Sequence, residues 1–244
     1  MSVRTRETQL VNIAQIVGSE QRAHSRGITS ADLVEFLSIA ADVIRDSSAD
    51  LDRLDAALGD GDHGENMVSG LQSVLEVLQD PPDDIGELLR TVGHTLVVSV
   101  GGASGPLYGT AFIEAGILLH GLESVDLPAL ALAFDAAAAG LARRGRCMAG
   151  DKTIYDALEP AARAVRKAAD KGWSLPVAIA AAAQAAHHGM VDTIPLVARR
   201  GLALRLGERS RGHQDPGATS CYLLLRAALA AAHQQSAHMM GSAA

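Results

Sequence analysis

Apolar residues recur three and four positions apart along most of the chain, with polar residues between them. Leu33, Leu37 and Ile44 show this spacing in the first clear segment. The spacing puts apolar side chains on one face of an α-helix, so it predicts amphipathic helices. The predicted helices cover about 29–58, with a break near Ser47, and then 64–80 and 85–98. A fourth helix runs through Phe112, Ile113 and Leu118, a fifth covers 126–144, and a sixth runs through Tyr155, Leu158 and Val165. The last two cover about 175–200 and 217–233.

The loops between these segments follow a regular order. Four glycine-rich loops, at about 59–66, 101–106, 145–153 and 201–217, come after the first, third, fifth and seventh helices. No convincing alternating strand pattern occurs, so the sequence predicts an all-α fold of eight antiparallel, up-and-down helices. Every second connection then lies at the same end, and we expect all four loops at one rim. Each loop leads into a helix N-terminus, whose free N–H groups and dipole favour anions.

Composition narrows the class of protein. The 244-residue chain contains 48% hydrophobic but only 3% aromatic residues and has a formal net charge of −7. The length fits one large domain, and the negative charge argues against nucleic acid or an anionic membrane as a partner. We find no basic-then-apolar leader and no apolar run long enough to span a bilayer, which favours a cytoplasmic location. Cys147 and Cys221 lack metal-ligand spacing and are expected to be free thiols.

The stretch from Asp55 to Asn66 contains the main candidate chemistry. Asp55 falls on the last turn of the first helix, and Asp60 and Asp62 follow on a loop rich in glycine. Glycine lets a backbone curl, and a curled loop would aim all three carboxylates at one point. Carboxylates that close repel one another unless a cation lies between them, and Mg²⁺ takes oxygen ligands while retaining phosphate or water. The stretch therefore predicts a magnesium site that holds phosphate; the alternative is a solvated acidic loop.

Polar residues on the same loops each have two interpretations. His63 could donate to a phosphate oxygen or orient the turn, and Asn66 could bond phosphate or hold a carboxylate. Ser104 resembles an N-cap, although its hydroxyl could equally face phosphate. The segment Gly145-x4-Gly150-Asp-Lys152 superficially resembles a Walker A loop. An extra Asp precedes the Lys and no strand precedes the loop, so we reject a P-loop.

The last glycine-rich loop adds positive charge. Arg200, Arg205 and Arg209 could reach phosphate or form a solvated basic edge. Asp215-Pro216-Gly217 is a stiff turn that could simply start the last helix. Asp151, in the preceding loop, is interpreted as a structural cap.

Four sequence words in this order resemble the nucleotide-binding (L) subunit of dihydroxyacetone kinase, the DhaL family. They are Gly59-Asp-Gly-Asp-His-Gly-Glu-Asn-Met67, Gly101-Gly-Ala-Ser-Gly-Pro-Leu-Tyr-Gly-Thr110, Gly150-Asp-Lys-Thr153 and Gly207-Glu-Arg-Ser-Arg-Gly-His-Gln-Asp-Pro-Gly-Ala-Thr219. The resemblance covers about residues 30–235. It implies an eight-helix barrel that binds ADP or ATP at one end. A helical domain over 28–236 would follow an N-terminal extension, 1–27, and precede a tail, 237–244.

The resemblance also implies the ligands. Two magnesium ions would be held by Asp55, Asp60 and Asp62, with no catalytic residue separate from the metal and nucleotide site. The residues implied to line the nucleotide are His63, Gly64, Glu65, Asn66, Ala103, Ser104, Gly145, Ile154, Arg200, Asp215, Pro216 and Gly217. The sequence departs from the family in two places. Gly61 stands where the family usually has Ala, and 201–206 replaces a pattern closer to Gly-Arg-Ala-Ser-Tyr-Leu.

The function implied by the resemblance is transfer of phosphate to a small ketone, such as dihydroxyacetone. The ketone would be held covalently by a histidine on a separate K subunit, so that this chain is half of an enzyme. The phosphate would come either from freely exchanging ATP or from fixed ADP that a phosphotransferase-system M subunit rephosphorylates. Alternatives are another ketose such as erythrulose, a fatty-acid kinase domain, or a nucleotide-sensing protein that binds a transcription regulator. A homodimer also stays open.

Overall fold

The structure is a computed structural model that describes residues 27–241, with side chains described to residue 235. The predicted N-terminal extension lies outside the described residues except for its last residue, and the predicted tail lies partly outside them. The described part is almost entirely helical, which confirms the all-α prediction. Its eight α-helices are α2 (Ser30–Ala56), α3 (His63–Val77), α4 (Ile85–Ser99), α5 (Ser104–Leu118), α6 (Leu127–Gly145), α7 (Tyr155–Asp170), α8 (Leu175–Asp192) and α9 (Pro216–Gly241).

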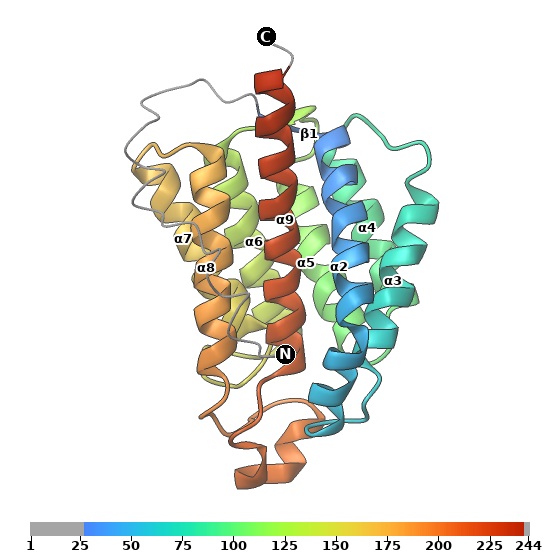
Figure 1. Cartoon of the computed structure of the whole chain (residues 1–244), viewed down its shortest axis with the longest axis vertical. Coiled ribbons are helices and arrows are strands. Elements are labelled where there is room, and N and C mark those ends of the chain that lie inside the picture. The colour runs from blue at the N-terminus through green and yellow to red at the C-terminus, as the bar shows by residue number, and fades with distance from the viewer. Residues whose placement is uncertain (1–26, 242–244) are drawn as a thin grey trace.

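The helices form a closed ring. Each packs against its neighbours in chain order, and α9 packs against α2 to close the barrel (Figure 1). Their inward faces carry a continuous core of leucine, isoleucine, valine and alanine, and small alanines let the helices approach closely. Among the described residues, no helix is both long and apolar enough to cross a bilayer.

The two ends of the barrel differ. One end carries a short antiparallel pair, β1 (Ile28–Thr29) with β2 (Ser124–Val125), where Ile28 pairs with Val125. The other end carries the α2–α3, α4–α5 and α6–α7 connections and a 3-10 helix, η3 (Leu202–Ser210), between α8 and α9 (Figure 1). The four glycine-rich loops therefore do lie at one end, as their alternation along the chain predicts.

Three helix boundaries differ from the predictions. The helix α8 ends at Asp192, not near residue 200, because Pro195 cannot donate a helical hydrogen bond. Thr193 reinforces this end, since its hydroxyl donates to the carbonyl of Met190 at 2.6 Å. The helix α2 has no break at Ser47, where the cost of serine in a helix is small. The helix α9 continues to Gly241, past the predicted end near 233, because 227–240 contains neither glycine nor proline.

Candidate metal and nucleotide site

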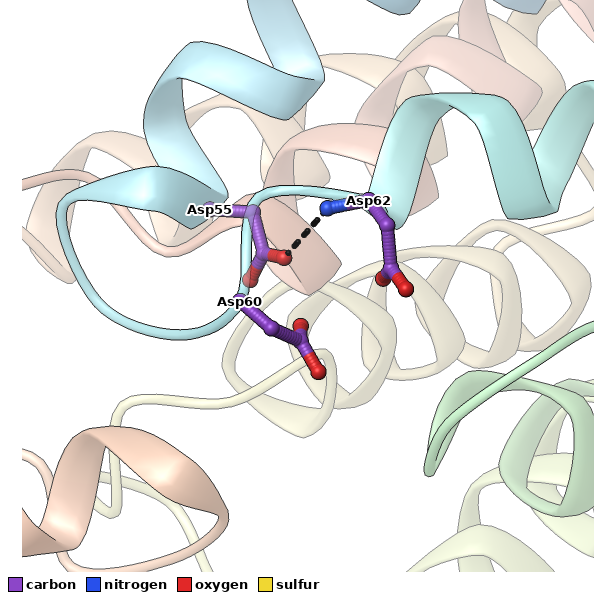
Figure 2. Close-up of side chains that lie close together, drawn as sticks. All are labelled: Asp55, Asp60 and Asp62. Atoms are coloured by element: carbon purple, nitrogen blue, oxygen red, sulfur yellow. Dashed lines mark hydrogen bonds between the residues drawn. The ribbon is translucent and has the colours of Figure 1, made fainter.

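The loop between α2 and α3 curls around the carboxylate of Asp55. This side chain, in the last turn of α2, accepts the backbone N–H of Gly61 at 2.8 Å and that of Asp62 at 3.2 Å. Gly61 has a φ of +85°, a conformation that favours glycine over residues with a Cβ. As a result Asp55, Asp60 and Asp62 each offer a carboxylate oxygen within 4.8 Å of the others (Figure 2). The predicted curl is therefore present.

The electrostatics of this cluster favour a cation. Burial raises the pKa of Asp55, and the neighbouring carboxylate of Asp60 raises it further, against the lowering effect of the Gly61 and Asp62 N–H groups. Asp60 and Asp62 are exposed, while Asp55 is half-buried. Three carboxylates supply the oxygen ligands that Mg²⁺ prefers, and their exposed side leaves coordination positions for phosphate or water. The residues present thus fit a divalent cation.

A residue that the sequence reasoning missed keeps Asp62 available to the cluster. Asp62 occupies the N-cap position of α3 but makes no capping hydrogen bond with its side chain. Asp52, one turn before Asp55 on α2, accepts the N–H of Gly64 at 2.6 Å and that of Glu65 at 3.3 Å instead. The signal was its i, i+3 spacing from Asp55, which puts both carboxylates on one side of α2.

His63 lies between three helix N-termini. Its Nδ1 is 3.1 Å from the hydroxyl of Ser104 at the start of α5, and its Nε2 is 2.9 Å from the hydroxyl of Ser220 in α9. The Ser220 hydroxyl also lies 2.7 Å from that of Tyr108. Burial lowers the pKa of His63 to about 4, so the imidazole is neutral at pH 7. Both ring nitrogens are thus engaged within the protein, and the arrangement favours the orienting role over donation to phosphate.

The contacts of Ser104 settle one of its two interpretations. Ala103, not Ser104, is the N-cap of α5, so the predicted capping role is wrong. The Ser104 hydroxyl is directed at His63 instead. Ser220 and Tyr108 were missed in the sequence, because nothing local marks residues that meet across 157 positions, the separation of His63 from Ser220. The rim is therefore organised by contacts between distant segments.

The loop before α7 is held in place by a buried lysine, Lys152. Lys152 is only 2% exposed, and its ammonium group donates to the carbonyl of Thr193 at 2.7 Å and to that of His213. The side chain therefore ties the α6–α7 loop to both ends of the segment between α8 and α9. It is not directed at a ligand as a Walker A lysine would be, consistent with the rejection of a P-loop. Asp156, in the first turn of α7, accepts the loop N–H groups of Gly150 and Thr153 and so also holds the loop.

Asp151 and Arg200 form an ion pair at this rim. The Nε of Arg200 donates to Oδ2 of Asp151 at 3.0 Å, and the same carboxylate oxygen accepts the N–H of Met148 at 3.1 Å. Asp151 thus has the structural role that the sequence predicts, although it holds its own loop and Arg200 rather than capping α7, whose N-cap is Ile154. Arg200 lies at the rim as predicted, but its guanidinium is already paired with a buried carboxylate.

The turn before α9 is closely packed. Asp215 accepts the N–H of Ala218 at 2.7 Å and so caps α9, while its own N–H donates to the Thr193 hydroxyl at 3.0 Å. Burial raises the pKa of the Asp215 carboxyl to about 7. A Cβ placed on Gly217 would lie 3.4 Å from the backbone nitrogen of Ile154, so these two predicted nucleotide residues are neighbours.

The remaining predicted nucleotide residues lie either in the first turn of α3 or at the ends of α5, α6 and α9. Gly64, Glu65 and Asn66 form the first turn of α3, and a Cβ on Gly101 would meet the Asn66 side chain at 2.6 Å. Ala103 precedes α5, Gly145 ends α6, and Pro216 begins α9. The structure therefore gathers the three aspartates into one cluster and spreads the predicted nucleotide residues over the same end of the barrel. The functional groups of Arg200 and His63 are already engaged within the protein, Arg200 by Asp151 and His63 by Ser104 and Ser220.

Comparisons with known proteins identify the family of this chain. The family profile of the DAK2 domain matches residues 57–230. The chain is 41% identical over 200 residues to the ADP-binding subunit DhaL of the PEP-dependent dihydroxyacetone kinase of Escherichia coli strain K12, covering 82% of this chain and 95% of that subunit. It is 35% identical over 199 residues to the L-erythrulose 1-kinase of Mycolicibacterium smegmatis, covering 80% of this chain but 34% of that kinase.

A solved structure shows the same arrangement of helices. The dihydroxyacetone kinase of C. freundii, in complex with AMP-PNP and Mg²⁺, superposes with a TM-score of 0.63 and 26% sequence identity. The match covers 86% of this chain and 36% of the kinase, so this chain spans about a third of that larger protein. With the profile match over most of the chain and the nearly full-length match to a free-standing subunit, this chain belongs to the DAK2-domain family, in the branch of the DhaL subunits of dihydroxyacetone kinase.

Proposed function

We propose that this chain is the nucleotide-binding, phosphoryl-donating subunit of a dihydroxyacetone-type kinase. The observation that carries the proposal is the convergence of Asp55, Asp60 and Asp62 beside the N-terminus of α3. Oxygen ligands next to free helical N–H groups suit a polyphosphate bridged by divalent cations. The relative from Escherichia coli is an ADP-binding subunit, which supports ADP as the nucleotide.

The three aspartates would hold two Mg²⁺ ions. Bound Mg²⁺ would neutralise the phosphates and help to align the transferred group. The carboxylates would act as ligands rather than bases, because the three converge on one point where a cation fits. Asp52 holds the start of α3, and Asp55 holds the loop, so the cluster keeps its shape before any ligand arrives. This preorganisation is where the protein contributes most in phosphoryl transfer.

The nucleotide would lie across the starts of α3, α5 and α9. The residues proposed to line it are His63, Gly64, Glu65, Asn66, Ala103, Ser104, Gly145, Ile154, Asp215, Pro216 and Gly217. The neutral His63 sets the positions of Ser104 and Ser220, and Asp215 caps the helix that follows Pro216. These contacts bring N-termini from distant parts of the chain to one ligand.

The ketone would be bound by a separate K subunit, onto which this rim docks so that the phosphate and the ketone hydroxyl meet in line. We propose a fixed ADP that is rephosphorylated by an M subunit; the name of the relative from Escherichia coli, which is PEP-dependent and ADP-binding, supports a PEP-driven route. The free-standing subunit from Escherichia coli is PEP-dependent and is matched over 95% of its length, whereas the erythrulose kinase is matched over 34%. Free exchange of ATP is the alternative.

Erythrulose is the second candidate substrate. The match to an L-erythrulose 1-kinase covers 80% of this chain at 35% identity, so this fold also serves the four-carbon ketose. The K subunit would select between the ketoses. Paired with a given K subunit, this chain should therefore support the ketose preference of that partner.

The experiment is dialysis of the purified chain in Mg²⁺, followed by extraction and quantification of bound nucleotide. We expect close to one ADP per chain, and loss of that ADP when EDTA replaces Mg²⁺. Mixing the chain with a K subunit and a PEP-driven donor should then phosphorylate dihydroxyacetone, with no product if either partner is omitted. A chain that binds neither ADP nor ATP in Mg²⁺ would contradict the proposed function.

A further inference from the structure

A groove runs between the acidic loop and the 3-10 helix η3. Its volume is about 300 Å³, and it is lined on one side by residues 56–60 and on the other by Leu202, Arg205 and Leu206. The helix η3 lies at the same end of the barrel as the α2–α3 loop (Figure 1). The groove therefore opens beside Asp60, one of the three aspartates proposed to hold metal.

The geometry of η3 directs Arg205 to this groove. A 3-10 helix has three residues per turn, so residues 202 and 205 share one face. Both line the groove, as the shared face requires. Gly207 follows with a φ of +55° and interrupts the helical backbone, so the residues after it follow a different course. Arg209 is not among the lining residues.

The charges on the groove are opposed across it. Among the described residues that line it, Arg205 is the only cation and Asp60 the only anion. No carboxylate within residues 27–235 lies close enough to Arg205 for an ion pair. By contrast, Arg200 is paired with Asp151. Arg205 is thus the cation that shares this groove with Asp60, and among residues 27–235 its guanidinium has no ion-pair partner.

We propose that Arg205 is a phosphate-binding residue of this chain and contacts the terminal phosphate of the Mg²⁺-bound nucleotide. The inference rests on the proposed function and assigns to Arg205 the nucleotide contact that the resemblance implies for Arg200. A guanidinium forms paired hydrogen bonds to phosphate oxygens, and it balances charge on the side away from the carboxylates. Arg205 is exposed, so its guanidinium is accessible to a ligand that enters the groove.

The test compares Arg205→Gln and Arg205→Lys with Arg209→Gln, a matched variant on the same helix outside the groove. Calorimetric titrations measure the Kd of ADP and of AMP in excess Mg²⁺, and circular dichroism checks the fold. Arg205→Gln should weaken ADP binding about 10- to 100-fold, the usual effect of losing a charged hydrogen bond. Arg205→Lys should recover part of that loss, and Arg209→Gln should bind ADP like the wild type. AMP, which lacks the terminal phosphate, should bind both glutamine variants equally.

Three results would overturn the assignment of Arg205: ADP binding unchanged in Arg205→Gln, an equal loss in Arg209→Gln, or an equal loss for AMP and ADP. The second would mean that the net charge of η3 matters rather than a contact. Failure of the wild-type chain to bind ADP at all would overturn the proposed function together with this inference. Normal binding by the wild type with no effect of Arg205→Gln would overturn this inference alone.

Discussion

The two ends of the barrel treat carboxylates in opposite ways. At the end with β1 and β2, Asp84 caps α4, accepting the N–H groups of Gly86, Glu87 and Gly121, and its Oδ2 lies 3.1 Å from Nδ1 of His120. Although burial raises it, these donors lower the pKa of Asp84 overall. At the other end Asp55 accepts two N–H groups but lies beside another carboxylate, and its pKa is raised.

The difference separates structural from functional acids. The carboxylate of Asp84 is satisfied by hydrogen-bond donors within the protein, so it stabilises the fold without a ligand. The aspartates at the rim have more oxygen atoms than donors, and a cation would supply the missing positive charge. An excess of carboxylate oxygen over internal donors is therefore the physical signature of the site, and it is visible only when both ends are compared.

The strongest way to break this comparison is to remove one carboxylate at each end. Asp55→Asn should abolish the Mg²⁺-dependent stabilisation of the chain by ADP. For the wild type this gain is about 2.7 kcal/mol when ADP is at 100 times its Kd. Asp84→Asn should keep the full gain. Thermal unfolding with and without Mg²⁺ and ADP measures both, and an equal gain in the two variants would remove the distinction between the ends.

The next largest effect is expected at Lys152. Lys152→Met removes the donor from two carbonyl groups, those of Thr193 and His213, and should lower the free energy of unfolding by about 2 kcal/mol. Lys167→Met, at an exposed position of α7, is the matched control and should change little. Urea denaturation measures both variants. Similar stabilities for the two would show that the buried ammonium does not hold the rim together.

A smaller loss is expected at the opposite end. Asp84→Ala removes the N-cap of α4 and should cost about 1 kcal/mol of stability. ADP binding should keep its wild-type Kd, because the cap lies at the other end of the barrel from the glycine-rich loops (Figure 1). Denaturation and calorimetry on one preparation test both parts. A weakened Kd would show that the two ends are coupled.

The smallest effect is the pH dependence of the chain without ligand. The pKa of Asp84 is lowered below its ordinary value of 3.8, so its contribution to stability is present above that pH and is lost as pH falls below about 4. The pKa of Asp55 is raised above 3.8, so its ionisation costs stability as pH rises from about 4. Solvent screens this half-buried group, and the cost is roughly 0.5 kcal/mol or less.

The variant Asp55→Asn isolates the small stability cost of ionising Asp55. Without Mg²⁺, the variant should lose less stability than the wild type as pH rises from about 4, because it has no carboxylate to ionise at this position. Below pH 4 the two curves should run in parallel. Denaturation at several pH values provides the measurement, and parallel curves throughout would show that ionisation of Asp55 carries no penalty.

The sequence predicted most of the fold because helices are local. Spacing of residues such as Leu37 and Ile44 identifies α2, and Asp126 at the start of α6 is a recognisable cap. The alternation of glycine-rich loops placed the site at one end without any knowledge of contacts. The ends of helices were less certain, as α8 shows, because a proline three residues further on decides where the helix stops.

The site itself could be predicted only in part. The three aspartates lie within eight positions of one another, so their chemistry can be seen in the sequence. The roles of Lys152, Ser220 and Arg200 depend on partners far along the chain, such as Thr193, His63 and Asp151. No local pattern records these partners. Residues that hold the loops in place through contacts with distant segments were therefore missed or given the wrong role.

One measurement tests the central claim most directly, namely calorimetric titration of ADP into the wild type and into Asp60→Asn, each with and without Mg²⁺. We predict that the wild type binds ADP tightly only in Mg²⁺, and that Asp60→Asn loses this binding while its helix content stays unchanged. Unchanged affinity in Asp60→Asn would contradict the account, because the carboxylates would then shape the loop without holding the cations that bind the nucleotide.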